Sequence, residues 1–360
     1  MKIGIVTQPL SDNYGGILQN YALQTVLKSM GHEPITLNVI PRDLGWRTWL
    51  THTVKYLLTL SPLTHKEEYL HLYYYREPLM ARFVKKNIVT TKVFRNYRHF
   101  DVEKMGLQAL IVGSDQVWRR QYNWNVWRDK FLAFAENNKI IRIAYGASWG
   151  KDKSEYPPAE QLECRRLSQK FNAISVREHS GVKLCQDVLG CDAIEVLDPT
   201  LLLKKDDYTR ITGDVTIPNE PYLAAYVLDQ ESWKLNLIKK IADERGLKVV
   251  DFGLGKGDVS VEKWLAYFAN ASYVLTDSFH GTLFSIINNK PFLTVVNESR
   301  GASRFESILN KFGLLDRIVK SESQIILQKD IDWSLVDKTI CEWRQNSMLF
   351  LESNLRENEN

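Results

Sequence analysis

The stretch 273–292, YVLTDSFHGTLFSIINNKPF, contains the residues best suited to acid–base chemistry. An apolar strand is expected to end at position 276. Asp277 or Ser278 can then cap a helix whose first N–H groups form a natural anion site. His280 stands at that helix start, Lys290 follows the helix, and a histidine beside a bound anion can act as a general acid. The ordinary alternative is a capped helix that carries a surface histidine.

A similar turn occurs earlier in the chain, at 175–180 (SVREHS). Arg177 directly follows an apolar segment and precedes a helical one. An arginine in that place can hold a carboxylate or a phosphate through two parallel hydrogen bonds. A surface ion pair between Arg177 and Glu178 is an equally good interpretation.

Two further turns carry polar groups next to aromatic rings. The segment 112–118, VGSDQVW, follows a predicted strand, and 11–16, SDNYGG, leads from a strand into a helix. Aromatic rings beside polar side chains suit the faces of sugars, although tryptophans this frequent more often pack in a core. The paired glycines would let a ligand approach the backbone.

Several familiar motifs are absent or incomplete. There is no GxGxxG after a predicted strand, no Walker loop, no HExxH and no carboxylate pattern typical of a metal site. The segment GASWG, 146–150, matches the GxSxG of serine hydrolases, whose nucleophile sits between a strand and an immediate helix. Here KDK and PP follow within a few residues, which disfavours a hydrolase.

The chain has 360 residues, 44% of them apolar and 25% charged, which predicts about two globular domains. No apolar run approaches the roughly 20 residues that span a bilayer. The first residues, MKIGIV, are typical of a strand and lack the features of a signal peptide. Four cysteines without a CxxC pair indicate neither a zinc site nor a disulfide framework, so we expect a reducing cytoplasm.

Short apolar segments alternate with helical periodicity, which predicts an α/β fold with parallel strands. The segment 204–221 is polar, contains Gly213, Pro218 and Pro221, and is the best linker candidate. We therefore expect an N-terminal domain at 1–205, a C-terminal domain at 206–333, and a final helix at 334–360 that packs back on the first domain. A site is expected in the cleft between the domains.

Charge is unevenly distributed. Residues 41–100 hold eleven Lys/Arg against four Asp/Glu, although the net charge of the whole chain is only +4, so binding of nucleic acid is not indicated. Within the basic aromatic insert 44–100, apolar residues between Leu44 and Leu58 follow a helical spacing. Two interpretations fit: a helix lying on an anionic membrane, or a helix packed on the core with a solvated basic face.

Taken together, these residues resemble the polysaccharide pyruvyl transferases. The resemblance is carried by NYGGILQNYAL (13–23), VGSDQVW (112–118), YGASWG (145–150), SVRE (175–178), LDPTLLL (197–203), TDSFHGT (276–282) and SRFESIL (303–309). It implies two Rossmann-like domains that face a cleft, as in glycosyltransferases of the B type, with no metal and no cofactor. The implied donor is phosphoenolpyruvate, and the product is a cyclic pyruvate ketal on a sugar.

The resemblance also assigns residues. Arg177, His280 and Lys290 match the positions at which the family meets phosphoenolpyruvate, with His280 as the general acid. Further donor-binding residues are expected near them: Ser278, Ser303 and Arg304. The general base is a choice between Asp115 and Asp12. The candidate acceptor-binding residues are Asp12, Asn13, Tyr14, Gln116 and Trp118.

We therefore expect a cytoplasmic pyruvyl transferase that acts on a saccharide precursor, with lipid-linked acceptors and peripheral contact with an anionic membrane among the partners that fit. Two alternatives remain open at this point. One is a glycosyltransferase of the same fold, which a ribose-binding acid and space for a base in the second domain would favour. The other is a non-catalytic saccharide-binding protein, which the presence of Arg177, His280 and Lys290 disfavours.

Overall fold

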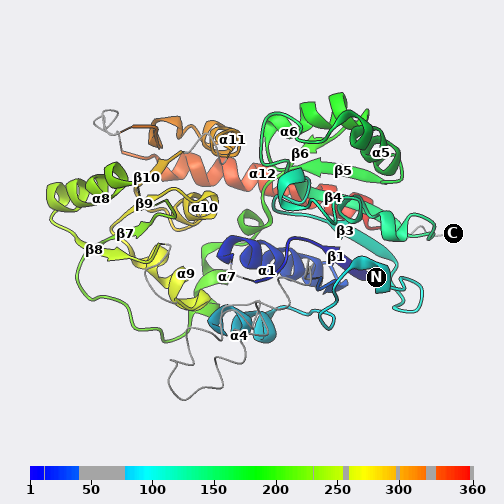
Figure 1. The fold of residues 1–360 in the computed structure, drawn as a ribbon. Helices are drawn as coiled ribbons and strands as arrows, with labels where there is room; N and C mark the ends of the chain where they lie inside the picture. The colour runs from blue at the N-terminus through cyan, green and yellow to red at the C-terminus, as the bar shows by residue number, and fades with distance from the viewer. Residues whose placement is uncertain are drawn as a thin grey trace, which may run out of the picture.

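Two parallel β-sheets, one in each half of the chain, form the frame of the molecule (Figure 1). The computed structural model describes residues 1–11, 13–39, 78–229, 231–253, 259–296, 301–321 and 330–356. In this part of the chain the first sheet has the order β2-β1-β3-β4-β5-β6. Its strands are β1 (Lys2–Val6), β2 (Glu33–Thr36), β3 (Ala109–Val112), β4 (Ile141–Ala147), β5 (Ala173–Val176) and β6 (Ile194–Glu195).

The second sheet has the order β11-β10-β9-β7-β8. Its strands are β7 (Tyr222–Tyr226), β8 (Lys248–Asp251), β9 (Tyr273–Thr276), β10 (Phe292–Val295) and β11 (Ile318–Val319). In each sheet the first strand has neighbours on both sides, β2 and β3 around β1, and β8 and β9 around β7. The chain reverses its direction of travel across the sheet there, and such switch points are where α/β folds bind ligands.

Helices connect the strands and cover the faces of the sheets (Figure 1). Those of the first half include α1 (Tyr14–Ser29), α4 (Pro78–Asn87), α5 (Pro158–Ser168) and α6 (His179–Leu184). Those of the second half include α8 (Ser232–Arg245), α9 (Val261–Asn270), α10 (Phe279–Ile287) and α11 (Ser303–Lys311). The strands are largely buried and apolar, because helices pack on both faces of a parallel sheet.

Part of the expected linker is a helix, α7 (Lys205–Thr212). The Asp207 carboxylate accepts a hydrogen bond from the N–H of Lys204 (2.8 Å) and caps this helix. The buried Tyr208 donates its hydroxyl to the carbonyl of Thr200 (2.8 Å), and its ring meets Phe284 edge-on. The polar composition of 204–221 therefore reflects the exposed side of a docked helix, and the irregular connection between the domains follows Thr212.

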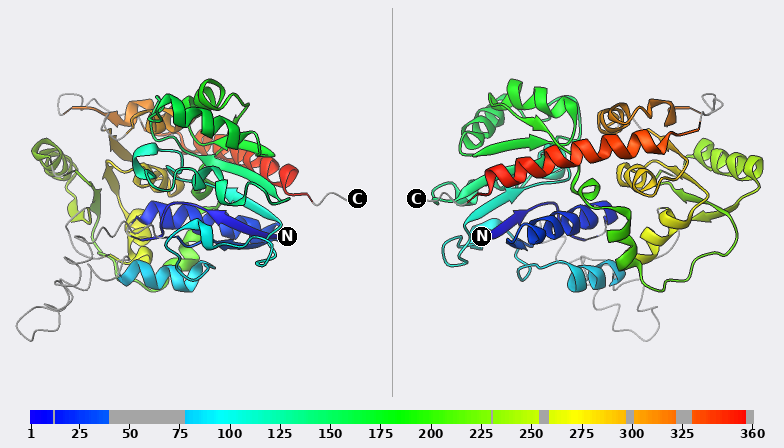
Figure 2. Two further views of the ribbon diagram at one scale, coloured as in Figure 1. Left: turned by 45° about the vertical axis from the view of Figure 1, so that its right-hand side comes forward. Right: turned by 180° about the vertical axis from the view of Figure 1, so that it is seen from behind.

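The helix α12 (Trp333–Asn354) runs along both halves of the molecule (Figure 2). Near its start, Asp337 accepts a hydrogen bond from the side-chain amide of Asn289 in the second domain (3.0 Å). Near its end, the Ser347 hydroxyl accepts one from the N–H of Leu197 in the first domain (3.0 Å). This helix therefore ties the two domains together. Among the described residues, no helix is long and apolar enough to cross a membrane.

The structure describes only the last part of the basic insert. The stripe between Leu44 and Leu58 lies outside the described residues. In α4, Met80, Phe83 and Val84 are buried and belong to the same core as α1 and α9. In this part of the insert, the apolar side of α4 therefore packs on the core, and its basic side chains are exposed.

Candidate active site

The N-terminal ends of α1 and α10, one from each domain, meet at the switch points of the two sheets. The ring of His280 in α10 lies directly against Gly15 in α1, and a Cβ atom built on Gly15 would be 1.9 Å from the Nδ1 atom of His280. The first N–H groups of a helix have no partner within the helix and carry partial positive charge. The meeting point therefore combines two such helix ends with one imidazole.

Ser278, and not Asp277, caps α10. The Ser278 hydroxyl accepts a hydrogen bond from the N–H of Gly281 (3.3 Å). Asp277 instead accepts bonds from the N–H groups of Leu228 and Asp229 and pairs with the buried ammonium of Lys234 (3.3 Å). Asp277 therefore serves the connection after β7, and its carboxylate does not reach the start of α10.

His280 faces a buried carboxylate that the sequence did not single out. Its side chain is 8% exposed, and its Nε2 atom lies 3.7 Å from the Oδ2 atom of Asp198. The other oxygen of Asp198 accepts bonds from the N–H (3.0 Å) and the hydroxyl (2.8 Å) of Thr200. Burial alone would raise the pKa of Asp198, but the interaction with His280 and the charge of Arg177 hold that pKa well below its usual range. Asp198 is therefore an anion at neutral pH.

Arg177 has a different place from the one expected of a ligand clamp. Its side chain is fully buried, with Nη1 2.5 Å from Asp198 Oδ2 and Nη2 3.2 Å from Asp115 Oδ1. Burial would lower the pKa of Arg177, but these two carboxylates outweigh burial and raise it. Arg177 therefore donates to two carboxylates and positions them, and its contact with the donor stays a prediction.

The side chains of Asp115, Arg177, Asp198 and His280 are defined here as the charged cluster. Asp115 follows β3 in the left-handed backbone region (φ 68°), which Asp tolerates better than most residues. Its Oδ2 atom approaches Gly16 of α1, so the carboxylate faces the start of that helix. The cluster thus joins the ends of β3 and β5, the turn at Asp198 and the start of α10.

A second arginine lies next to the charged cluster. The guanidinium groups of Arg304 and Arg177 both lie against the ring of Phe279, with centroid distances of 5.4 and 4.7 Å. Burial, followed by the nearby charge of Arg177, lowers the pKa of Arg304 to about 10. Arg304 is still a cation at neutral pH, in a place where added negative charge would be favourable.

Lys290 is separated from the charged cluster. It follows the C-terminal end of α10, whereas His280 lies in the first turn, and the helix rises about 10 Å from His280 to its last residue, Ile287, at 1.5 Å per residue. Burial, together with the charge of Lys205, lowers the pKa of Lys290. The structure therefore places Lys290 and His280 at opposite ends of α10, and the expected contact of Lys290 with the donor stays a prediction.

The predicted acceptor residues do not form one surface. Trp118 is fully buried, stacks on Phe131 and donates its indole N–H to the carbonyl of Lys130 (3.1 Å), so it belongs to the core. Tyr14 stacks on Trp264 of the other domain, and its hydroxyl donates to the carbonyl of Val259 (2.5 Å). Both aromatic rings therefore pack against other parts of the protein, and the expected sugar-binding roles of Trp118 and Tyr14 stay predictions.

The polar members of that set have other partners or lie outside the structure. The Asn13 side chain accepts a bond from the N–H of Gly16 (3.1 Å) and caps α1. The Gln116 side-chain oxygen accepts one from Arg119 (2.9 Å). Asp12 lies outside the described residues, so the structure does not test it as the general base.

Ser148 of the GxSxG match is not placed as a nucleophile. Its side chain is buried, and its hydroxyl accepts a bond from the N–H of Gly150 (3.1 Å). The next helix, α5, begins only at Pro158, so the strand–turn–helix of a hydrolase is missing here. In the described part of the chain, no group of three or more His, Cys, Asp or Glu side chains could hold a metal ion.

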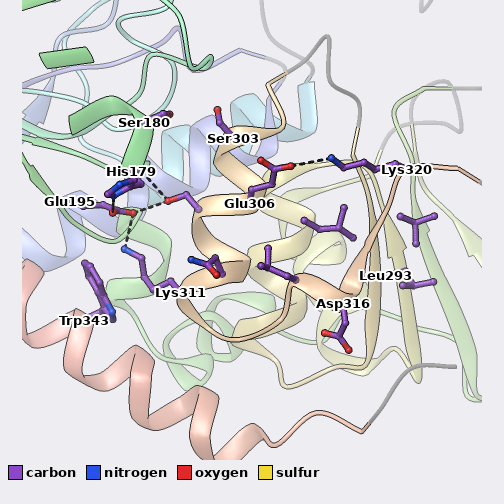
Figure 3. A pocket seen from close by; sticks show the side chains of 15 residues that line it. His179, Ser180, Glu195, Leu293, Ser303, Glu306, Lys311, Asp316, Lys320 and Trp343 are labelled. Carbon is purple, nitrogen blue, oxygen red and sulfur yellow. Dashed lines mark hydrogen bonds and ion pairs between the residues drawn. The ribbon is translucent and has the colours of Figure 1, made fainter. Parts of the chain in front are cut away.

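A groove of about 870 Å³ lies beside α11 (Figure 3). We call it the α11 groove. Its lining residues are His179, Ser180, Glu195, Leu293, Ser303, Glu306, Ser307, Asn310, Lys311, Leu315, Asp316, Ile318, Val319, Lys320 and Trp343. Ser303 lines this groove, and its Oγ atom is buried and makes no hydrogen bond to another residue described in the structure.

A comparison with models of known protein families shows to which family the chain belongs. The family model described as polysaccharide pyruvyl transferase matches residues 13–299, which is most of the sequence. The chain belongs to the polysaccharide pyruvyl transferase family. In this pyruvyl transferase the matched region includes all four residues of the charged cluster, while Arg304 lies just beyond it. No curated protein sequence matches the chain significantly.

Solved structures resemble this pyruvyl transferase in fold. UDP-GlcNAc 2-epimerase from Neisseria meningitidis bound to UDP-GlcNAc matches with a TM-score of 0.50 and 10% identity, over 99% of each chain. The S. aureus MnaA–UDP complex matches with a TM-score of 0.51 and 11% identity, over 96% of this chain and 90% of that one. The expected fold class, two Rossmann-like domains arranged as in B-type glycosyltransferases, is confirmed.

Proposed function

We propose that this pyruvyl transferase takes its pyruvyl group from phosphoenolpyruvate and transfers it to a sugar as a cyclic ketal, with release of phosphate. The observation that carries the proposal is His280. It lies at the meeting point of two helix N-termini, beside the anionic Asp198, with the cation of Arg304 close by. This arrangement supplies both a proton and positive charge to a small dianionic or trianionic donor.

Phosphoenolpyruvate needs binding groups for a carboxylate and a phosphate. The first-turn N–H groups of α1 and α10 point toward the meeting point and can accept either anion. Arg304 adds a guanidinium whose burial strengthens its attraction for an anion. Ser278 is half-buried at the cap of α10 and stays a proposed neighbour of the donor.

The reaction places a proton on carbon and moves phosphate to solvent. The His280 imidazolium donates its proton to the methylene carbon of the enol, and a sugar hydroxyl adds to the adjacent carbon as it loses its own proton. The C–O bond to phosphate then breaks, the phosphate leaves with the bonding electron pair, and a second hydroxyl of the same sugar closes the ketal. Two hydroxyl protons are released and one is consumed in forming the methyl group, so the second leaves on phosphate.

Within this scheme Asp198 stabilises the imidazolium, and Arg177 holds Asp198 in place. Asp115 is the proposed acceptor of the hydroxyl proton among the described residues, since it faces the start of α1 across the meeting point. A positioned acid of this kind typically contributes a factor of about 10²–10⁴ to the rate.

The test is release of phosphate from phosphoenolpyruvate that depends on an added saccharide. Arg304→Gln should weaken donor binding by roughly 10–100-fold, because a hydrogen bond to a charged group contributes about 1.5–3 kcal/mol. The matched control is Arg210→Gln, whose exposed side chain pairs only with Asp207 of its own helix. Binding or hydrolysis of a nucleotide-sugar, without use of phosphoenolpyruvate, would favour the glycosyltransferase alternative instead.

We further propose that the acceptor is lipid-linked and that α4 and the segment after it lie against an anionic membrane on the cytoplasmic side. Residues 78–98 contain no acid, while several cations are exposed: Arg82, Lys85, Lys86, Lys92, Arg95 and Arg98. Val89 and Val93, on the same segment, are 46% and 57% exposed. Each cation near such a surface contributes about 1 kcal/mol, and salt screens it.

The membrane proposal is tested by sedimentation with vesicles. We expect binding to vesicles that contain phosphatidylserine, with a steep loss as salt rises, and no binding to neutral vesicles. Lys85→Glu combined with Lys86→Glu should weaken binding, whereas Lys239→Glu combined with Lys240→Glu on the exposed side of α8 should not. Equal binding to both kinds of vesicle would contradict an electrostatic contact.

A further inference from the structure

We propose that the α11 groove binds the saccharide acceptor, and that it takes a neutral part of that saccharide. The identification of the ligand as the acceptor rests on the proposed function, whereas the description of the groove as a binding site rests only on the geometry. At about 870 Å³ it lies within the range of roughly 300–1,000 Å³ that is usual for small-molecule sites.

Both domains contribute to the groove (Figure 3). Ser303, Glu306, Ser307 and Asn310 lie three or four residues apart along α11, so they form one continuous face of that helix. The opposite wall, from the first domain, is formed by the start of α6 and by Glu195 at the end of β6. A ligand in the groove would therefore contact both halves of the enzyme, as an acceptor in an interdomain site must.

The charges of the lining residues disfavour an anion. Three carboxylates and two ammonium groups line the groove: Glu195, Glu306, Asp316, Lys311 and Lys320. Both ammonium groups already have partners, because Lys311 pairs with Glu195 (2.9 Å) and Lys320 pairs with Glu306 (3.2 Å). Asp316 pairs in turn with Arg317 (3.1 Å), so a phosphate or a nucleotide diphosphate would meet no lining ammonium group that lacks a carboxylate partner. A neutral polyhydroxylated molecule needs no such group.

The polar groups suit hydroxyls. A sugar hydroxyl both donates and accepts, and the groove offers carboxylate acceptors beside amide and hydroxyl groups. Asn310 is exposed along the helix face, and the Glu306 carboxylate is about half exposed despite its ion pair. The Ser303 hydroxyl, in the wall at one end of the groove, is buried and makes no hydrogen bond to any described residue, which leaves one unsatisfied polar group beside the ligand.

One end of the groove is fixed before any ligand arrives. The Lys311 ammonium lies 3.1 Å from the centroid of the Trp343 ring, and burial lowers the pKa of Lys311 while the neighbouring Glu195 opposes that effect. Ser307 donates to the same Glu195 carboxylate (2.8 Å) and accepts from the N–H of His179 (3.0 Å). These contacts join α11, α12 and the first domain into a rigid wall.

The other end of the groove is adjacent to the donor-binding groups. Ser303 and Arg304 are consecutive in the first turn of α11, and the first lines the groove while the second lies against Phe279. A saccharide chain in the groove therefore has one end at the first turn of α11, where a hydroxyl can approach the donor.

The test blocks the groove with a large side chain. Asn310→Trp should fill it from an exposed position on α11, and the matched control is Asn236→Trp at an exposed position on α8. The probes are methyl glycosides of galactose and mannose and their disaccharides, observed by saturation-transfer NMR with phosphoenolpyruvate present. We expect at least one glycoside to bind the wild type and Asn236→Trp, with at least a tenfold loss of affinity in Asn310→Trp and no displacement by UDP.

Each other outcome overturns part of the account. Three results would overturn the assignment of the groove. They are undiminished glycoside binding in Asn310→Trp, displacement of the glycoside by UDP, and no glycoside binding to the wild type. The affinity for phosphoenolpyruvate, measured by calorimetry, should be the same in all three proteins. If the wild type neither binds nor consumes phosphoenolpyruvate but a glycoside still occupies the groove, the proposed function fails while the saccharide site stands.

Discussion

Residues of both domains form the charged cluster and the α11 groove, yet the two sites differ in the solvent exposure of their charged side chains. In the cluster, Arg177 and Asp198 are at most 1% exposed and are compensated within the protein. In the groove, Glu306 and Lys320 form an ion pair whose side chains are each more than 40% exposed. The cluster is therefore fixed when the chain folds, whereas the groove keeps polar groups that a ligand can still use.

The difference has an energetic side. Removing one partner of a buried ion pair leaves an uncompensated charge, which costs about 3–5 kcal/mol, while exposed pairs typically contribute about 0–1 kcal/mol. Substitutions in the cluster should therefore affect folding and chemistry, and substitutions in the groove should affect acceptor selection. Four measurements sharpen or break this contrast.

The largest effect is expected on turnover in His280→Ala. Loss of the acid should lower kcat for phosphate release by about 10²–10⁴-fold, with a smaller effect on donor affinity than Arg304→Gln has. His32→Ala, far from the cluster near the N-terminus, is the control. A normal rate in His280→Ala would show that the histidine only packs against α1.

In Arg177→Ala we expect a loss of unfolding free energy that is similar in size to the rise in activation free energy in His280→Ala. The substitution leaves Asp198 and Asp115 buried beside each other without their cation, and should cost about 3–5 kcal/mol of unfolding free energy in urea titrations. Arg210→Ala, an exposed pair within α7, should cost less than about 1 kcal/mol. Equal losses in the two variants would mean that Arg177 is not compensated as the structure shows.

Acid should weaken the cluster through Asp198. Its pKa is lower in the folded protein than in the unfolded chain, where it is about 3.9, so the unfolded state binds more protons as the pH falls. The stabilisation is complete at neutral pH and is lost as the pH falls below about 4–5. Unfolding titrations at several pH values should show a gap between wild type and Asp198→Asn that narrows with acid. A constant gap would contradict the depressed pKa.

The smallest effect is expected in Glu306→Gln. Because the ion pair with Lys320 is exposed, the unfolding free energy should change by less than about 1 kcal/mol. Donor affinity should stay the same, and only the KM for the acceptor should rise. A large loss of stability would place Glu306 in the structural framework and remove the contrast between the two regions.

Much of the fold could be predicted from local patterns. The strand expected to end at position 276 is β9, and the strand expected before the polar residues of 112–118 is β3, because buried parallel strands are short continuous apolar runs. The helix α7 was missed, since its sequence is polar apart from Tyr208 and Ile211, and its position depends on packing.

The site was less predictable, because it depends on which charges meet in space. The structure brings His280, Arg177 and Arg304 into one region, but the contacts of Arg177 depend on Asp198, 21 residues further along the chain. The Asp-Pro pair at 198–199 is typical of an ordinary turn, so its type alone gave no signal for an ionised partner of histidine. Trp118 and Tyr14 were predicted to face a sugar, and their stacking on Phe131 and Trp264 could not be read from the local sequence.

Gly15 has a consequence for any survey of variants. It has no functional atom, yet any side chain there would overlap the His280 ring of the opposite domain. A scan of all substitutions would therefore find Gly15 as sensitive to substitution as the reactive residues, although Gly15 only leaves room for the His280 ring. For this enzyme, substitutions at Gly15 would be harmful because the His280 ring of α10 fills the space beside it. The two positions should therefore be varied as a pair.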